Sequence, residues 1–405
     1  MKRPMKNRNV GIIGVGQTKY SSHKEYQNQP EMIHEAVREA LKDANLKMSD
    51  IDCVVHGNME LFEMQFQPDL WHSLGTGSYG KQEYRITTGG TTGSTLVCAA
   101  DNLVASGRHN IVMVIGMEKL QEGHTTAGIT NMACPLWHRH LQTGALGSNT
   151  SARALIQEFG AERARKAAMR YRILMDKHAM LNPLAHRRLS FDYDQAESLI
   201  ESSPRLVGEL RLIHMCSQSD GACVLILASE EIAVASANRP AWIRDHITVH
   251  REEAYNIYGH VRPEHTQRYA ARKLFERNGI KSPMDYFDVF EMYDPSAWWA
   301  LEWLRDFLLL DGDEILKLLE GGEFDLDGRL PVNPSGGVIA SNPIGATAAA
   351  RIAEGALQIR GDAGAHQVKR NAEHALCSGF GGTRWTTLMM LEKQLNWTEV
   401  GNGQK

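Results

Sequence analysis

Residues 33–55 read "IHEAVREALKDANLKMSDIDCVV", and residues 267–290 read "QRYAARKLFERNGIKSPMDYFDVF". Each stretch has the pattern of an amphipathic helix, then a short turn, then a hydrophobic strand, with Leu46 and Ile280 at equivalent places. An internal repeat of this kind indicates that one structural unit occurs more than once in the chain. We therefore predict two copies of one layered α/β unit.

A second pair of segments supports this repeat. Residues 89–107, "GGTTGSTLVCAADNLVASG", are answered by residues 336–361, "GGVIASNPIGATAAARIAEGALQIRG". Each is a Gly-rich turn that leads into an Ala-rich helix with apolar residues at helical spacing. Further apolar runs are predicted to be strands, at residues 9–18, 110–118, 221–229 and 384–393. Strands that alternate with helices favour sheets covered by helices on both faces.

The two copies differ in one long insertion. Residues 119–215 are rich in His, Met, Arg and Trp and show no clean period. Such insertions usually carry substrate-binding loops or an oligomer contact. We therefore predict a first half at residues 1–240, which includes the insertion, and a second half at residues 241–405.

Composition excludes several classes of function. The 405 residues carry a formal net charge of −4, and no Lys/Arg cluster alternates with aromatic residues, which argues against nucleic-acid binding. No run of 18 apolar residues occurs and the N-terminus lacks an apolar signal region, so we predict a cytoplasmic protein without a membrane span. The six cysteines are scattered without a CxxC pair, and "GIIGVGQT" lacks the full dinucleotide-binding spacing. No metal and no nucleotide cofactor are predicted.

Four motifs carry a resemblance to a known family: "NVGIIGVGQT" (9–18), "VIGMEKL" (114–120), "SDGACVLILASEE" (219–231) and "VNPSGGVIASNPIGATAAAR" (332–351). With the repeat, they make residues 9–394 resemble the thiolase superfamily, and within it the sterol-carrier-protein type of thiolase. "RGDAGAHQV" (360–368) is similar to a subgroup that works with a small zinc-ribbon/OB-fold partner. That subgroup includes benzoylsuccinyl-CoA thiolase and the retro-aldol lyases of steroid side chains.

The resemblance implies a fold, a substrate and partners. The expected fold is a duplicated, five-layered α/β/α/β/α arrangement with a loop insertion. The expected substrate is an acyl-CoA, with coenzyme A as part of the substrate and no other cofactor. A homodimer is expected, together with a small zinc-ribbon/OB-fold partner subunit.

The positions of the usual thiolase catalytic groups hold other residues here. Thiolases carry a nucleophilic Cys in a "CASG"-like turn, a His in "HPxGATG", a His in an "HDCF"-like block and a Cys in "CxGGG". These positions fall at Gly90, Asn342, Tyr293 and Cys377 of this chain, so only the last keeps its side chain.

Three interpretations of this change stay open. In the first, the enzyme makes or breaks a C–C bond by acid/base chemistry, as in retro-aldol cleavage of a β-hydroxyacyl-CoA, and donors hold the thioester enolate. In the second, thiolysis or acyl transfer continues with Cys377, Ser94 or Thr91 as a substitute nucleophile. In the third, the chain is a non-catalytic subunit that binds an acyl-CoA.

The candidate catalytic residues are Tyr293, Asn342 and Cys377, predicted to lie together around the acyl thioester. The candidate substrate-binding residues are glycines, whose backbone N–H groups would hold an oxyanion at a helix N-terminus: Gly89, Gly90, Gly93 and Gly381. Structural alternatives apply to each of them. Tyr293 could be a core aromatic residue, Asn342 a helix cap, Cys377 an inert buried thiol, and the glycines the parts of a tight turn.

Overall fold

The computed structural model describes residues 8–65, 67–131, 144–190, 193–250, 265–381 and 385–395. Nine strands of this part form one sheet in the order β3-β2-β4-β7-β1-β8-β11-β10-β9. The strands of the first half are β1 (Val10–Gln17), β2 (Cys53–Gly57), β3 (Gln82–Arg85), β4 (Ile111–Lys119) and β7 (Asp220–Ser229). Those of the second half are β8 (Ala241–His250), β9 (Val289–Glu291), β10 (His374–Phe380) and β11 (Trp385–Glu392).

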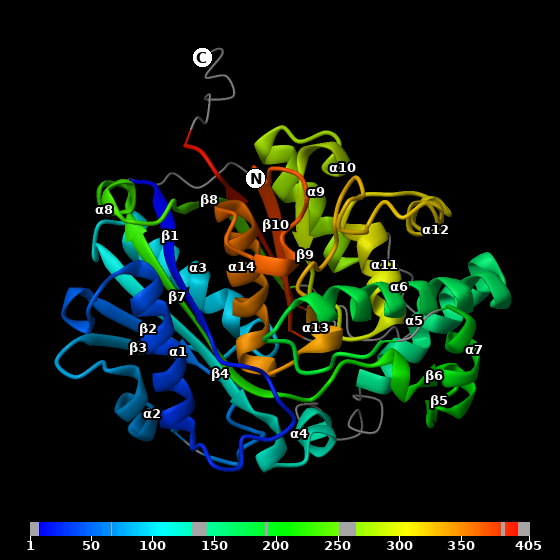
Figure 1. Ribbon diagram of the computed structural model, residues 1–405, viewed down its shortest axis with the longest axis horizontal. Coiled ribbons are helices and arrows are strands. Elements are labelled where there is room, and N and C mark those ends of the chain that lie inside the picture. Colours follow the sequence, from blue (N-terminus) through cyan, green and yellow to red (C-terminus); the bar gives the residue numbers. More distant parts are fainter. Residues whose placement is uncertain are drawn as a thin grey trace.

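Helices separate the strands into layers. α1 (Gln29–Ala44) covers β1 and β7, and α9 (Thr266–Asn278) covers β8 and β11. Between the two sets of strands, α3 (Thr92–Ala105) and α14 (Ile344–Arg360) pack together, and α14 contacts both β4 and β10. Figure 1 shows α14 in the middle of the molecule, between the strands of the two halves. The order is helix, strands, central helices, strands, helix, which confirms the predicted five-layered α/β fold.

The duplication is visible in the order of elements. The first copy runs β1-α1-β2-α3-β4-β7 and the second runs β8-α9-β9-α14-β10-β11, with the remaining elements as additions. The two copies are joined directly, because Gly11 and Ile12 of β1 pair antiparallel with Trp242 and Ala241 of β8. We propose that the boundary between the halves lies at residues 240 and 241, where β8 begins.

Local sequence sets both ends of α1. The Asn28 side chain accepts a hydrogen bond from the Glu31 N–H at 2.9 Å, and the Glu31 carboxylate accepts one from the Asn28 N–H at 2.9 Å. This reciprocal capping box satisfies backbone donors that the first turn leaves without helical partners. The helix ends at Asn45, which has a φ of 54° in the left-handed region.

The insertion between β4 and β7 is mostly helical. It contains α4 (Thr125–Asn131), α5 (Gly144–Phe159), α6 (Ala161–Leu181), α7 (Tyr193–Ser202) and the hairpin of β5 (Arg205–Val207) and β6 (Leu210–Arg211). α6 packs against α5 and also against α11 (Ala297–Phe307), α12 (Glu314–Glu320) and α13 (Gly337–Ala340) of the second half. Because neighbours surround α6, polar residues such as Arg172 and Asp176 are buried in it, and the sequence shows no amphipathic period.

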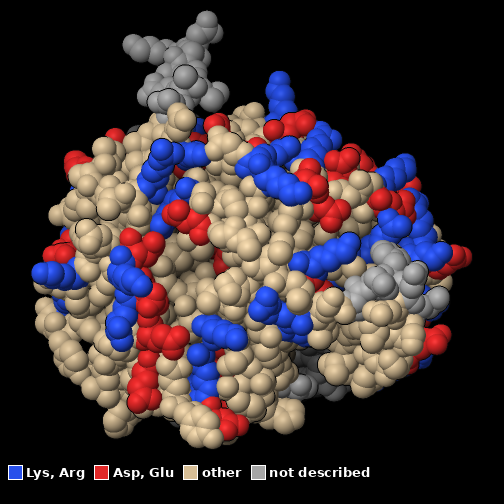
Figure 2. All heavy atoms as spheres, viewed as in Figure 1, with Lys and Arg blue, Asp and Glu red and all other residues tan. Residues whose placement is uncertain are grey.

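Three short helices complete the described part: α2 (Asp69–Thr76), α8 (Glu230–Ala235) and α10 (Pro283–Tyr286). Within the described residues, no helix combines the length and the apolar character that crossing a membrane requires. On the face shown in Figure 2, basic and acidic side chains are interspersed.

The central helices approach each other closely at Gly93. A methyl group at Gly93 would lie 2.3 Å from the backbone N and 2.9 Å from the Cβ of Ala349 on α14. Neither contact is possible without a shift of the backbone, since protein interiors are close-packed. Gly93 therefore allows α3 and α14 to bring their N-terminal ends together.

We expect Gly93→Ala to lower the free energy of unfolding by about 1–3 kcal/mol, the usual cost of overpacking a tight core. Denaturant titration followed by circular dichroism measures this change. Asn102→Ala, at an exposed position of the same helix, is the matched control and should change stability by less than about 0.5 kcal/mol. Equal stability of Gly93→Ala and the wild type would contradict the close approach.

Candidate active site

Tyr293 follows β9 and lies at the boundary between the halves. Its backbone N–H donates to Ser378 Oγ of β10 at 2.9 Å. A methyl group at Gly90 would lie 3.1 Å from the Tyr293 hydroxyl oxygen, so this hydroxyl points at the glycine turn of the first half. Burial raises the pKa of Tyr293 well above its usual range, and the nearby Cys216 raises it further. The phenol is therefore protonated near neutral pH and suited to donate a hydrogen bond or a proton.

The turn before α3 needs glycine for two reasons. Gly89 has a φ of 64°, in the left-handed region that favours glycine. A methyl group at Gly90 would lie 2.2 Å from the Phe380 carbonyl oxygen, and one at Gly381 would lie 2.8 Å from Thr91 Oγ1. The structure thus brings Gly89, Gly90 and Gly381 together beside Tyr293. Gly93 lies apart from them, in the contact between α3 and α14.

Asn342 enters the same region from the segment before α14. Its amide Nδ2 donates to Cys216 Sγ at 3.2 Å, and its Oδ1 accepts from the Thr347 hydroxyl at 2.9 Å. The Thr347 side chain also lies close enough to the Tyr293 hydroxyl to lower its pKa, against the effect of burial. Pro343 precedes the first residue of α14, and no side chain caps this helix. Asn342 is therefore hydrogen-bonded to Thr347, whose side chain lies near Tyr293, and Asn342 does not cap α14.

Cys377 lies away from these groups. A methyl group at Gly355 of α14 would lie 2.5 Å from Cys377 Sγ, so the thiol faces the middle of that helix. Tyr293 packs beside Ala348 instead, about two helical turns or roughly 10 Å nearer to the start of α14. Burial raises the pKa of Cys377 well above its usual range. The prediction that Cys377 lies with Tyr293 and Asn342 is corrected by the structure, which instead places its thiol in the core.

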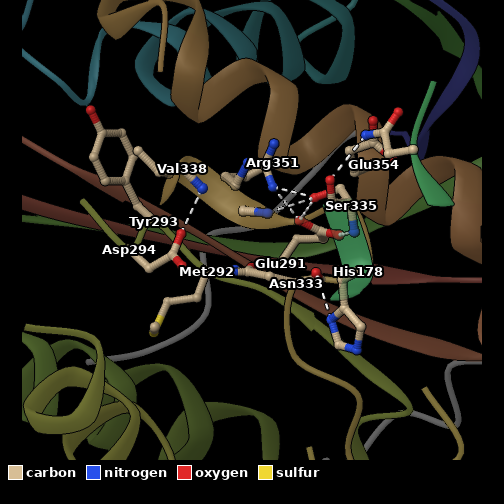
Figure 3. Close-up of polar contacts among 12 residues, drawn as sticks. His178, Glu291, Met292, Tyr293, Asp294, Asn333, Ser335, Val338, Arg351 and Glu354 are labelled. Atoms are coloured by element: carbon tan, nitrogen blue, oxygen red, sulfur yellow. Dashed lines mark hydrogen bonds and ion pairs between the residues drawn. The ribbon is translucent and has the colours of Figure 1, made fainter. Parts of the chain in front are cut away.

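A buried ion pair fixes the strand that precedes Tyr293. Arg351 Nη1 of α14 lies 2.5 Å from Glu291 Oε2 and 2.5 Å from Ser335 Oγ (Figure 3). Glu354, one turn further along α14, accepts a hydrogen bond from His366 Nε2 at 2.8 Å. Burial raises the pKa of Glu291 to about 7 although Arg351 opposes the shift. These groups hold β9 against α14.

Asp294 fixes the chain on the other side of Tyr293. Its Oδ1 accepts from the Val338 N–H at 2.6 Å (Figure 3). Its Oδ2 accepts from the Tyr171 hydroxyl of α6 at 2.8 Å. Burial raises the pKa of Asp294 to about 7. Glu291 and Asp294 therefore act as carboxyl groups that position the loop, and Tyr293 stands between two anchored neighbours.

Comparison with known sequences identifies the family. The family model "Thiolase, N-terminal domain" matches residues 10–180, and the model "Thiolase C-terminal domain-like" matches residues 261–393. Together they account for most of the chain.

The chain belongs to the thiolase family.

Individual relatives agree with this assignment. The acetyl-CoA acetyltransferase of Methanothermobacter thermautotrophicus is 29% identical over 94% of this chain and 98% of the relative. Sterol carrier protein 2 of Bos taurus is 27% identical over 95% of this chain and 72% of the relative. Among solved structures, the Ltp2-ChsH2(DUF35) aldolase superposes with a TM-score of 0.77 at 22% identity, covering 96% of this chain and 100% of the other. The dimeric peroxisomal thiolase of Saccharomyces cerevisiae gives 0.69 at 17% identity, covering 96% and 99%.

The two hydroxyl groups predicted as substitute nucleophiles, those of Thr91 and Ser94, both donate hydrogen bonds within the glycine turn. Thr91 Oγ1 donates to the Thr88 carbonyl oxygen at 2.6 Å, and Ser94 Oγ donates to the Thr91 carbonyl oxygen at 2.9 Å. Ser94 is also 1% exposed. Both hydroxyl groups are therefore committed to the first turn of α3, and the thiol of Cys377 lies in the core.

Sequence reasoning missed Cys216, which lies in the loop before β7. Its backbone N–H donates to the Pro295 carbonyl oxygen at 2.9 Å, and its thiol accepts from Asn342 and packs in the same cluster as Tyr293. The available signal was the segment "CSQSDGA", which places this cysteine directly before a buried strand. The sequence of this segment does not show which other loop contacts the thiol. The contact between Cys216 and Asn342 is therefore visible only in the three-dimensional structure.

A cavity of about 630 Å³ lies between α6, α7 and the β5–β6 hairpin, and Tyr293, Asn342 and Cys216 are not among the residues that line it. Its wall carries both basic and acidic side chains: Arg165, Lys166, Arg205, Arg211, Glu162, Glu201 and Glu209. His214 and Trp298 also line it and are themselves buried, so they mark its inner end. His214 is two residues from Cys216, and burial lowers its pKa to about 4, which keeps it neutral. Among the described residues, no group of His, Cys, Asp and Glu side chains is arranged to hold a metal ion.

Proposed function

We propose that this chain makes or breaks a C–C bond next to an acyl-CoA thioester by holding an enolate, without a covalent acyl-enzyme. Acyl-CoA chemistry at a C–C bond agrees with its family and with relatives named acetyl-CoA acetyltransferase. Retro-aldol cleavage of a β-hydroxyacyl-CoA is the form of this chemistry that we favour, and acyl transfer is the second candidate.

The position of the Tyr293 hydroxyl against Gly90 carries this proposal. In thiolases the position of Gly90 holds the nucleophilic cysteine, and here a phenol faces a bare backbone instead. The candidate substitute nucleophiles Thr91, Ser94 and Cys377 are hydrogen-bonded within the turn or buried away from it. A phenol and an amide near a glycine turn suit the stabilisation of an oxyanion better than they suit nucleophilic attack.

The groups divide the work at the thioester. The Asn342 amide nitrogen carries two N–H groups and donates one of them to Cys216. The second N–H would donate to the thioester oxygen. The neutral Tyr293 hydroxyl donates to the oxygen on which charge develops. Donors of this kind matter most in the transition state, where the negative charge is largest. Coenzyme A belongs to the substrate.

Intact-protein mass spectrometry tests the absence of an acyl-enzyme. After incubation with acetyl-CoA and with longer acyl-CoAs, we expect no stable acyl adduct, whereas β-hydroxyacyl-CoAs should be cleaved to a shorter acyl-CoA and a carbonyl compound. A stable adduct would show acyl transfer instead, and its position would identify the nucleophile. Binding of acyl-CoAs without any turnover would support the third interpretation, a non-catalytic subunit.

We also propose that the chain forms a homodimer through the edge of the sheet at β3. Strand β3 ends the sheet order on this side, and an unpaired edge is a template for association. Exposed apolar side chains gather on the neighbouring helix α2: Leu70 at 68%, Trp71 at 63% and Leu74 at 58% exposure. Such patches on a protein surface mark interaction sites. The contribution of the insertion, residues 119–215, to the same interface stays a prediction from the sequence.

Trp71→Glu combined with Leu74→Glu should convert the dimer to a monomer, because two charges would be desolvated in each copy of the interface. Sedimentation velocity at micromolar concentration measures the change. Val234→Glu, at a residue that is 67% exposed on α8, is the matched control and should leave the dimer intact. A wild-type protein that sediments as a monomer would refute the dimer.

A second subunit is a separate expectation. The Ltp2-ChsH2(DUF35) aldolase is a complex with a DUF35 partner, and the segment "RGDAGAHQV" led us to expect a small zinc-ribbon/OB-fold partner. We propose that such a subunit binds this chain. The cytoplasmic location stays a prediction from the sequence.

A further inference from the structure

The thiol of Cys216 shares its immediate surroundings with the two groups that we place at the thioester. Its Sγ lies 3.2 Å from Asn342 Nδ2, and it packs in one cluster with Tyr293. Among the described cysteines it alone is partly exposed, while Cys53, Cys98, Cys223 and Cys377 are buried. Cys216 is thus the one described cysteine whose residue is not fully enclosed in the core.

Two cations act on this thiol: Arg187, which is partly buried, and Arg172, which is fully buried. The Arg187 guanidinium donates to the carbonyl oxygens of Met215 and Ile339 at 2.6 and 3.0 Å, which also holds the loop that carries Cys216. Arg172 of α6 is fully buried and pairs with the Asp176 carboxylate through Nε and Nη2 at 2.9 and 2.7 Å, while its Nη1 has no hydrogen-bond partner. A thiolate formed at Cys216 would therefore meet the positive charge of Arg187, while Asp176 compensates the charge of Arg172.

The other charged groups around Cys216 limit that effect. Enclosure by protein raises the pKa of the Cys216 thiol to about 11, Arg187 and the Asn342 hydrogen bond lower it, and Asp294 raises it. The Tyr293 hydroxyl is uncharged near neutral pH. The resting group is thus a neutral thiol, which suits a proton carrier better than a standing nucleophile.

We propose that Cys216 is the acid/base residue that moves the proton at the α-carbon of the acyl-CoA. This inference rests on the proposed function. In the direction of enolate formation, the thiol first loses its proton to water, and the thiolate then takes the proton from the α-carbon. The C–H electron pair becomes the enolate, whose oxygen is held by Asn342 and Tyr293. In the reverse direction the thiol returns its proton to the same carbon. Sulfur forms no bond to carbon, and nothing is oxidised or reduced.

The exchange of the α-protons of acetyl-CoA in deuterium oxide tests this role without knowledge of the natural substrate. We expect the wild-type protein to exchange them, as followed by proton NMR, and Cys216→Ala to be slower by at least about 100-fold, the usual effect of losing a general acid/base. Cys377→Ala, at the thiol in the core, is the matched control and should exchange at the wild-type rate. Thermal unfolding of each variant checks that the fold is retained.

Two further measurements separate a chemical role from a packing role. Cys216→Ser preserves the size of the side chain but not the acidity of the thiol, so exchange should stay low; a wild-type rate in this variant would overturn the proposal. For the wild type, the rate should rise nearly tenfold per pH unit between about pH 7 and 9, because the thiolate fraction rises below a pKa of about 11. After subtraction of the hydroxide-catalysed exchange measured without protein, Cys216→Ala should show almost no enzyme-dependent rate at any of these pH values, and an undiminished enzyme-dependent rate would overturn the proposal.

Bromoacetyl-CoA gives an independent readout, because a thiolate near the α-carbon displaces bromide and forms a stable thioether. Peptide mapping should find the label on Cys216, with protection by acetyl-CoA. A label on Cys377, or no label on any cysteine, would contradict the assignment.

The outcomes separate this inference from the proposed function. If the wild type and Cys216→Ala exchange α-protons at the same rate, the role of Cys216 is wrong and the enolate chemistry stands. If the wild type exchanges no α-protons, the proposed function fails together with this inference.

Discussion

Tyr293→Phe should lower turnover of a β-hydroxyacyl-CoA by at least tenfold and leave KM nearly unchanged. Loss of one oxyanion donor typically costs about 10²–10³ in turnover, and the ring of Phe keeps the packing beside Ala348. Because the hydroxyl points at the glycine turn, its removal affects the charge that develops there and not the binding of coenzyme A. Steady-state kinetics with purified protein measures both quantities.

Asn342 is the partner in this test. Asn342→Ala should also lower turnover more than acyl-CoA binding, since its amide meets the same developing charge. Cys377→Ala, with its thiol in the core, should keep turnover within a few-fold of the wild type. Near-wild-type rates for both Tyr293→Phe and Asn342→Ala would exclude this site and direct the search to the insertion or to a partner subunit.

Arg351→Met should lower the free energy of unfolding by about 3–5 kcal/mol, the usual cost of breaking a buried ion pair by removing one partner. Arg351 is 2% exposed and lies 2.5 Å from Glu291, which itself is fully buried. The substitution leaves the Glu291 carboxyl group without its cation, and part of the cost will be recovered as that group takes up a proton. Chemical denaturation near neutral pH measures the loss.

A surface pair provides the control for this substitution. Arg329 pairs with Asp285, and these side chains are 46% and 63% exposed. Arg329→Met should change stability by less than about 1 kcal/mol because water screens the pair. An equally small change for Arg351→Met would show that the ion pair does not hold β9 in place.

Much of the fold could be predicted because its signals are local and occur twice. The helix-turn-strand pattern around Leu46 returns around Ile280, and each glycine turn leads into one of the central helices. The insertion was harder to predict, because α6 is buried between neighbours from both halves and carries no amphipathic period. Hydrophobic periodicity indicates a helix with one solvent-exposed face, and the middle of α6, residues 171–176, is buried on every side.

The site could be predicted only in part. Tyr293 and Asn342 could be predicted to lie near each other because each occupies a motif position, and Thr347, which bonds Asn342, lies near Tyr293; their catalytic role stays a prediction. Cys377 was misplaced because side chains of a strand alternate between faces and levels that motif letters do not show. Cys216 was missed because its contact with Asn342 joins loops from different halves of the chain.

The contact between the two copies at Gly90 and Tyr293 also limits which substitutions the chain can accept. The first copy contributes a bare backbone turn at Gly90, while the second contributes the side chains of Tyr293 and Asn342. Neither copy alone supplies all the groups of the proposed site. A substitution that enlarges the turn in one copy must be tolerated by a tyrosine in the other. Because these residues of the two copies are in contact, a change of chemistry at this site requires substitutions in both copies.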